Sequence, residues 1–170
     1  MAYTSNTFKQ LFEANRNKAS LMSFVKKNPD CFVPLLEFSL SPSPDAWRAV
    51  WLIGHAMKSN DARVIPFIDN LIISLPLLRQ GHQRQTIIVL SKMELNDSQE
   101  GKLFDVCLTI WENIKLIPST RITAIRFILK TTDKFPELKK EVNLWTQEMY
   151  LESLSPGIKV RFLREIKKIQ

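Results

Sequence analysis

Four basic residues recur along the chain at nearly equal spacing. Arg48, Arg84, Arg121 and Lys159 follow one another at intervals of 36, 37 and 38 residues. Where a helical unit repeats, side chains at equivalent positions line up along the stack, so these four could form a ladder of positive charge. Such a ladder would attract phosphates or an acidic helix, more weakly as salt rises. Each cation could instead pair with an Asp or Glu of a neighbouring repeat, and this pairing is the reading we favour.

Two tryptophans flank the first of these cations. Trp47 and Trp51 stand four residues apart on either side of Arg48. Aromatic rings beside a basic group can stack on nucleic-acid bases or grip a peptide. A tryptophan pair at this spacing more often packs into a helical core, and we expect the core role here. The candidate binding residues are Arg48, Arg84, Arg121, Lys159, Trp47 and Trp51.

Residues that could hold a metal or carry catalysis are few. The chain has two histidines, His55 and His82, and two cysteines, Cys31 and Cys107, at scattered positions. A zinc site needs three or four such ligands, so we expect no metal site, and both thiols are predicted to be buried. The sequence contains no glycine-rich phosphate loop, nucleophile elbow or HExxH helix. We therefore expect no cofactor and no enzymatic activity.

The net charge of +7 is concentrated towards the two ends of the chain. Residues 1–28 carry a net +4 and residues 118–170 a net +5, whereas residues 29–117 carry a net −2. This balance permits weak binding to nucleic acid or another polyanion but does not require it. The most apolar stretch, Val64–Leu78, is interrupted by prolines and polar residues and is too short for a membrane span. Since the N-terminal segment also lacks a signal-peptide pattern, we expect a soluble, cytoplasmic protein that does not enter a membrane.

Apolar residues recur at intervals of three and four, which predicts helices rather than strands. Helices are expected at 4–15, 18–27, 30–40, 44–58, 62–78, 82–94, 98–115, 119–133, 136–152 and 156–169. Ser43 is the expected N-cap of the fourth helix, and Asp97 with Glu100 has the spacing of a capping box. Gly81 is a candidate left-handed C-terminal cap. Gly54 inside a helix indicates that a neighbouring helix approaches closely.

The helices form a repeating unit. Segments 24–37 and 56–69 align at an offset of 32, which pairs Pro34 with Pro66 near the start of a second helix. Four apolar residues that each follow a ladder residue by four positions are predicted to form one buried line. These residues are Leu52, Ile88, Ile125 and Leu163. Two helices in every 32–38 residues are the signature of an α-solenoid.

Two segments resemble a known family. The stretch Ala49–Gly54 is similar to the first helix of a HEAT repeat, and Arg63–Leu71 is similar to its second helix. The resemblance covers most of residues 17–170, and the whole chain also resembles small HEAT-like bacterial proteins of similar length. It implies an all-α fold, a right-handed α-α superhelix of the HEAT/armadillo solenoid class. About four helical pairs with capping helices would form a single HEAT-like domain over residues 1–170.

We expect a non-enzymatic binding or scaffold module that presents a concave helical surface to a protein partner. The alternative is a nucleic-acid-binding protein, because a HEAT-like fold also serves DNA glycosylases that remove alkylated bases. No residue here matches the catalytic acid of those enzymes, and a fold alone does not fix a chemistry. The sequence indicates neither the partner nor the oligomeric state.

Overall fold

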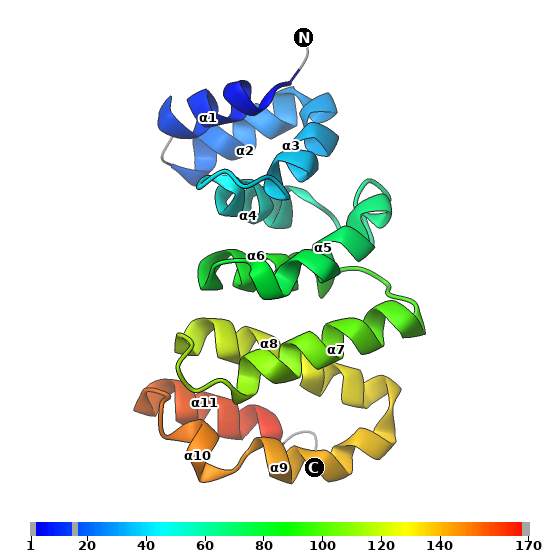
Figure 1. Ribbon diagram of the computed structural model, residues 1–170, viewed down its shortest axis with the longest axis vertical. Coiled ribbons are helices and arrows are strands. Elements are labelled where there is room, and N and C mark those ends of the chain that lie inside the picture. The colour runs from blue at the N-terminus through cyan, green and yellow to red at the C-terminus, as the bar shows by residue number, and fades with distance from the viewer. Residues whose placement is uncertain (1–2, 15–16, 168–170) are drawn as a thin grey trace. The chain divides into compact units, whose positions relative to one another are not determined.

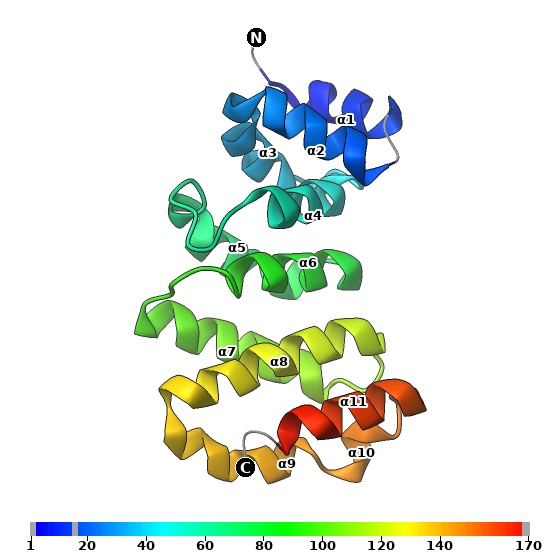
Figure 2. The same ribbon diagram turned by 180° about the vertical axis from the view of Figure 1, so that it is seen from behind.

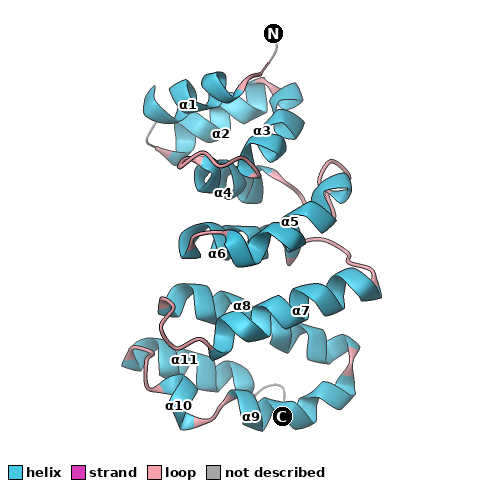
Figure 3. Ribbon diagram, in the orientation of Figure 1, coloured by secondary structure: helices cyan, strands magenta, loops and turns pink. Residues whose placement is uncertain are grey.

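The computed structural model describes residues 3–14 and 17–167, and every regular element in these ranges is a helix (Figures 1 and 3). The α-helices are α1 (Ser5–Ala14), α2 (Lys18–Lys27), α3 (Phe32–Ser39), α4 (Ala46–Ala56), α5 (Ile68–Ser74), α6 (Gln80–Leu90), α7 (Asp97–Glu112), α8 (Pro118–Lys134), α9 (Val142–Trp145), α10 (Glu148–Leu151) and α11 (Pro156–Ile166). Short 3₁₀ segments are η1 (Pro29–Cys31), η2 (Ile65–Phe67), η3 (Leu75–Leu77) and η4 (Pro136–Glu141). The chain divides into two compact units, Met1–Gln99 and Glu100–Gln170.

The expected helix at 18–27 coincides with α2, whose N-cap Asn17 accepts a hydrogen bond from the Ser20 amide at 2.8 Å. The expected helix at 62–78 is shorter in the structure, where only Ile68–Ser74 is α-helical. Pro66 and Pro76 lie in the 3₁₀ segments on either side. A proline has no amide hydrogen and crowds the preceding turn, so each proline limits how far the α-helix extends.

In the unit Met1–Gln99, α4 packs against α3 on one side and α6 on the other, and both ribbon views show α4 beside α6 (Figures 1 and 2). The ring of Phe38 lies 5.5 Å from that of Phe8 and 6.1 Å from that of Phe12, which joins α1 to α3. All three rings are buried. Burying such a side chain stabilises the fold by about 1.5–3 kcal/mol, so the cluster anchors α1 to the rest of the unit.

The close approach expected at Gly54 is present between α4 and α6. A Cβ atom on Gly54 would lie 3.4 Å from Val89 Cγ2. Lys92 Nζ also donates a hydrogen bond to the Gly54 carbonyl at 2.5 Å. Helix α6 therefore lies close to the α4 backbone at Gly54, with room for a Cβ atom but not for a larger side chain.

The structural repeat is 36 residues rather than the 32 of the sequence alignment. Segment η1 with α3 and segment η2 with α5 start 36 residues apart. At this offset four buried residues of each copy coincide: they are Phe32, Leu35, Leu36 and Ser39 in the first copy, and Ile68, Leu71, Ile72 and Leu75 in the second. Relative to this 36-residue repeat, Pro34 and Pro66 are offset by four residues, which is about one helical turn. The two prolines are therefore not at equivalent positions. A one-turn shift keeps the same helix face buried, which explains why the sequence patterns also match at 32.

The predicted apolar line is confirmed at two of its four positions. Leu52 and Ile125 are fully buried, whereas Ile88 and Leu163 are only half-buried. Cys31 and Cys107 are both buried free thiols, as expected.

Three local signals differ from the sequence expectation. The helix expected from Ser43 begins at Ala46, because residues 43–46 form a turn closed by the Ala46 amide and the Ser43 carbonyl at 3.1 Å. Gly81 lies inside α6, and none of the described glycines has a positive φ. The left-handed residue is Asn60, with φ of 47°, in the turn that follows α4.

The capping box of α7 is one residue earlier than expected. The Gln99 amide donates to Asn96 Oδ1 at 2.9 Å, and the Asn96 amide donates to Gln99 Oε1 at 3.3 Å. The side chains of Asn96 and Gln99 thus form the capping box, rather than those of Asp97 and Glu100. Glu100 instead accepts from Lys134 Nζ in α8, at 2.6 Å.

In the unit Glu100–Gln170, the core is centred on Trp111. Its ring lies 5.2 Å from that of Phe162 and 6.1 Å from that of Tyr150, and its Nε1 donates to the Trp145 carbonyl at 3.0 Å. One buried ring thereby joins α7, α9, α10 and α11. Among the residues that the structure describes, no helix is both long and apolar enough to cross a membrane.

Candidate binding site

The two tryptophans are not core residues, contrary to the sequence expectation. Trp47 is 45% exposed and Trp51 is half-buried. Although they are neighbours on one face of α4, they line two different cavities. Both cavities lie within the unit Met1–Gln99.

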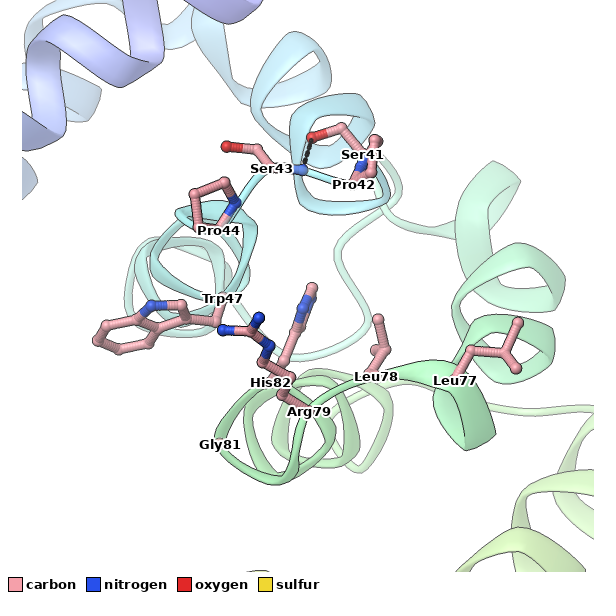
Figure 4. A pocket seen from close by; sticks show the side chains of 10 residues that line it. All are labelled: Ser41, Pro42, Ser43, Pro44, Trp47, Leu77, Leu78, Arg79, Gly81 and His82. Carbon is pink, nitrogen blue, oxygen red and sulfur yellow. Dashed lines mark hydrogen bonds between the residues drawn. The ribbon is translucent and has the colours of Figure 1, made fainter.

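Trp47 lines a cavity of about 590 Å³, which we call the Trp47 cleft (Figure 4). The cleft is formed by the loop before α4, by Trp47, and by the end of η3 with the start of α6. Its lining residues are Ser41, Pro42, Ser43, Pro44, Trp47, Leu77, Leu78, Arg79, Gly81 and His82. Leu77 is 88% exposed, and in Figure 4 its side chain points away from Trp47. The cleft therefore combines apolar surface with the cation of Arg79, and its lining contains no carboxylate side chain.

His82 is the unusual polar group of this cleft. It is only 7% exposed, and its Nε2 is buried without a hydrogen-bond partner. Burial lowers the pKa of His82 to about 4, although a hydrogen bond to the Ser39 backbone acts in the opposite direction. His82 is therefore neutral at pH 7.

Trp51 lines a second cavity, of about 510 Å³, with Gly54, His55, Arg84, Gln85, Ile88 and Lys92; we call it the Arg84 cavity. The ring of Trp51 lies 4.6 Å from that of His55, and His55 Nδ1 is 2.9 Å from the Trp51 carbonyl. Because a carbonyl oxygen only accepts, Nδ1 carries the hydrogen of this bond. Arg84 Nε is buried and has no hydrogen-bond partner.

The other three ladder cations are engaged within the protein. Arg48 Nη1 donates to the Phe12 carbonyl at 2.6 Å and lies 3.8 Å from Asp45 Oδ1. Lys159 Nζ pairs with Glu148 Oε1 at 2.5 Å. Both residues have an acidic partner, as the favoured sequence reading expected, although that of Arg48 lies only three residues away, and Arg48 also donates to a backbone carbonyl.

Arg121 is a buried structural residue with no exposed surface. Its Nε donates to the Trp111 carbonyl and Nη2 to the Tyr150 carbonyl, both at 2.9 Å, and Nη1 donates to Ser153 Oγ. The guanidinium also lies 4.6 Å from the centre of the Trp111 ring. Desolvation lowers the pKa of Arg121, yet the group keeps its charge because the ordinary arginine value is so high.

Arg121 and Arg84 are not equivalent, which explains their different surroundings. The buried positions of α6 match those of α8 at an offset of 38 residues: His82, Gln83, Thr86, Ile87 and Leu90 correspond to Thr120, Arg121, Ala124, Ile125 and Ile128. Arg121 thus corresponds to Gln83, whose Nε2 donates to the Leu75 carbonyl of the preceding helical segment at 3.0 Å. A shift of one residue rotates a side chain by about 100° around the helix, from the partly exposed face into the core.

A family model of the HEAT repeat domain matches residues 9–169, nearly the whole chain. The chain belongs to the HEAT repeat domain family. No curated protein and no solved structure matches it. The match confirms the resemblance noted in Ala49–Gly54 and Arg63–Leu71, and with the helices described above it confirms the expected all-α helical-repeat fold.

In this HEAT repeat chain, the sequence singled out Trp47 and Arg84, which each line a cavity, but it did not single out Arg79, His82 or Leu77 as binding residues. The expected helix at 62–78 would have carried Leu77 and Leu78 on an ordinary apolar face. Pro76 was the available signal, since a proline after the first turn favours the end of an α-helix. Among the described residues, no group of three or more His, Cys, Asp or Glu side chains is placed to hold a metal ion.

Proposed function

We propose that this HEAT repeat protein is a non-enzymatic binding module that docks a protein partner in the Trp47 cleft. The partner segment would carry an apolar or aromatic anchor next to a carboxylate. The observation that carries the proposal is the exposure of Trp47 and Leu77, at 45% and 88%, around a cavity of about 590 Å³. Large apolar side chains exposed around a hollow are typical of surfaces that bind other proteins.

Charge complementarity supports the choice of partner chemistry. Arg79 is exposed at the rim of the cleft, and the lining residues bring no carboxylate to pair with it. A carboxylate on the partner would supply that counter-charge, while the apolar anchor covers Trp47.

The nucleic-acid alternative has less support from the ladder residues. Arg121 is buried, Lys159 pairs with Glu148, and Arg48 is held by the Phe12 carbonyl. These contacts leave Arg84 as the one ladder residue without an ion pair or hydrogen bond to the described residues. Non-specific nucleic-acid binding needs several cations that neutralise successive phosphates.

The test begins by capturing the partner at the cleft. A photo-reactive amino acid replaces Leu77, and the same residue replaces Ile65, which is 51% exposed in η2 and does not line the cleft, as the matched control. A protein cross-linked from Leu77 but not from Ile65 is then purified, and its affinity is measured by calorimetry. We expect Trp47→Ala to weaken binding at least tenfold, about 1.4 kcal/mol, and Ile65→Ala to leave it unchanged.

Equal affinity of the wild-type and Trp47→Ala proteins for this partner would contradict the proposal. Binding to nucleic acid is tested by fluorescence anisotropy with labelled single- and double-stranded DNA and RNA at two salt concentrations. Sub-micromolar binding at physiological salt, lost when Arg84 is changed to Gln, would favour that alternative over a protein partner.

The proposal treats residues 1–170 as one domain that works in the cytoplasm. Helix α7 begins at Asp97, before the division at Gln99, and continues to Glu112, so one uninterrupted helix belongs to both compact units. Helix formation is cooperative, and this continuity favours unfolding of the units together. Calorimetry should show one transition whose van't Hoff and calorimetric enthalpies agree, and two resolved transitions would indicate two domains. Cell fractionation tests the location.

A further inference from the structure

We propose that the Arg84 cavity is a binding site for a phosphoryl dianion, either free phosphate or a phosphate ester. Its lining brings the side chains of Arg84, Lys92, His55 and Gln85 to one cavity of about 510 Å³. The site is separate from the Trp47 cleft, and the proposal does not depend on docking of a protein there.

The charge of Arg84 is not neutralised by any of the described side chains. Several other arginines are neutralised by carboxylates: Arg63 pairs with Asp61 and Arg126 with Glu165, each at 2.7 Å. Arg84 forms no ion pair with any of the described residues, and its Nε is buried without an acceptor. A guanidinium charge without a counter-ion is costly in a partly buried position, so an anion bound beside Arg84 in the cavity would reduce that cost.

A second cation, Lys92, lines the same cavity. Lys92 Nζ donates one hydrogen bond to the Gly54 carbonyl, which fixes the ammonium group against α4 and leaves two of its three hydrogens for a ligand. The lining contains no carboxylate. Two cations that share a cavity without a counter-ion raise its positive potential, which favours an anion of charge −2 over one of charge −1.

The donors in the cavity also indicate the shape of the ligand. Three of the lining side chains, Arg84, Lys92 and Gln85, carry N–H donors, whereas His55 uses its Nδ1 hydrogen on the Trp51 carbonyl. Together these three side chains offer more N–H donors than the roughly four lone-pair sites of one carboxylate can accept, and such a set suits the tetrahedral oxygens of a phosphoryl group. Arginine recognises phosphate through paired N–H donors, and lysine adds a point charge.

The test is a titration of the full chain with inorganic phosphate, with sodium chloride at matched ionic strength as the reference. The Nε–Hε resonance of Arg84 is followed by ¹H–¹⁵N NMR, since this group is buried and has no partner in the free protein. We expect a saturable shift of this resonance with a dissociation constant of about 1 mM or lower. Arg84→Gln removes the probe, so the variants are compared by isothermal calorimetry.

Arg84→Gln should weaken phosphate binding at least tenfold, and Lys92→Gln several-fold. Arg84→Lys keeps the charge but loses the paired donors, so its affinity for phosphate should lie between those of the wild type and Arg84→Gln. Lys9→Gln removes one charge from an exposed position on α1 outside the cavity and serves as the matched control, with unchanged affinity expected. Circular dichroism verifies that each variant is folded.

Two results would overturn the proposal: an Arg84 resonance that moves equally with phosphate and chloride, or equal affinity for phosphate in folded Arg84→Gln and Lys9→Gln. A parallel titration with O-phosphoserine separates the two sources. Affinity equal to that of inorganic phosphate supports the site and assigns it to phosphate esters. Clearly weaker binding of O-phosphoserine than of phosphate supports the site and assigns it to the free ion.

Discussion

The guanidinium of Arg63 lies 3.6 Å from the centre of the Phe32 ring while it pairs with Asp61. Arg63 Nη2 and Nε donate to the two oxygens of Asp61 at 2.7 and 2.9 Å. Phe32 begins α3, whereas Asp61 and Arg63 lie in the turn that follows α4. The side chain of Arg63 therefore covers a buried ring of one repeat while it holds the connecting turn of the next.

Removing Arg63 should destabilise the protein. Arg63→Ala leaves Asp61, which is 1% exposed, without its cation and also uncovers Phe32. We expect a loss of about 2–3 kcal/mol in the free energy of unfolding, measured by urea denaturation. Arg63→Lys should recover only part of it, because lysine lacks the paired donors. Arg79→Ala, at an exposed rim position, is the control and should change stability by less than about 0.5 kcal/mol; similar losses for both alanine variants would contradict this role.

Arg84 and Arg121, which follow each other in the ladder, should lose different amounts of stability when each is changed to alanine. Arg121→Ala removes a buried guanidinium that satisfies the Trp111 and Tyr150 carbonyls, and should cost about 3–5 kcal/mol. Arg84→Ala removes a partly exposed side chain without such partners and should cost less than about 1 kcal/mol. Urea denaturation of the two variants compares these losses. A larger loss for Arg84→Ala would mean that the one-residue difference in register is wrong.

Gly54 should accept alanine but not valine. The Cβ of alanine would contact Val89 Cγ2 at 3.4 Å, an ordinary packing distance, and alanine favours a helix over glycine by about 1 kcal/mol. Gly54→Ala should therefore leave stability unchanged or raise it by up to about 1 kcal/mol. Gly54→Val adds two methyl groups between α4 and α6 and should cost about 1–3 kcal/mol. Thermal denaturation compares them, and an equal loss in both variants would show that the limit is backbone conformation rather than space.

The stability of the protein should fall below pH 6.5 because of His82. The pKa of His82 in the folded protein is about 4, below the ordinary value of 6.5. Between these two pH values the unfolded chain binds a proton at His82 and the folded chain does not. The contribution is complete above pH 6.5 and is lost as the pH falls towards 4, at no more than about 1.4 kcal/mol per pH unit. Urea denaturation at several pH values should show a shallower dependence in His82→Gln than in the wild type.

Asp61 is a second acid-sensitive group, and its effect on stability occurs at a lower pH than that of His82. The hydrogen bonds from Arg63 lower the pKa of Asp61 to about 2 from 3.8, so the stability due to that carboxylate persists to about pH 4 and is lost between pH 4 and 2. Parallel curves for the wild type and His82→Gln between pH 6.5 and 4 would contradict the assignment to His82.

The sequence by itself determined where most helices form and that they repeat. Helix α2 has the predicted bounds, the close approach at Gly54 is present, and the similarity of Ala49–Gly54 to a HEAT repeat agrees with the family match over residues 9–169. These features depend on local interactions, since caps, prolines and apolar spacing act over one or two turns of helix. The one-turn error in the alignment of Pro34 with Pro66 preserved the helix face and so left the fold prediction intact.

Only the tertiary structure decided which side chains of those helices are available for binding. Arg84 and Arg121 look equivalent in the sequence, but one residue of register turns the second into the core, where it donates to backbone carbonyls. Trp47 looks like a core residue, yet the loop at Ser41–Pro44 and the end of η3 leave it beside a cleft. Successive side chains of an α-helix point in directions about 100° apart. Which face is exposed therefore depends on how each helix is rotated against its neighbours, and the local spacing of apolar residues does not specify this rotation.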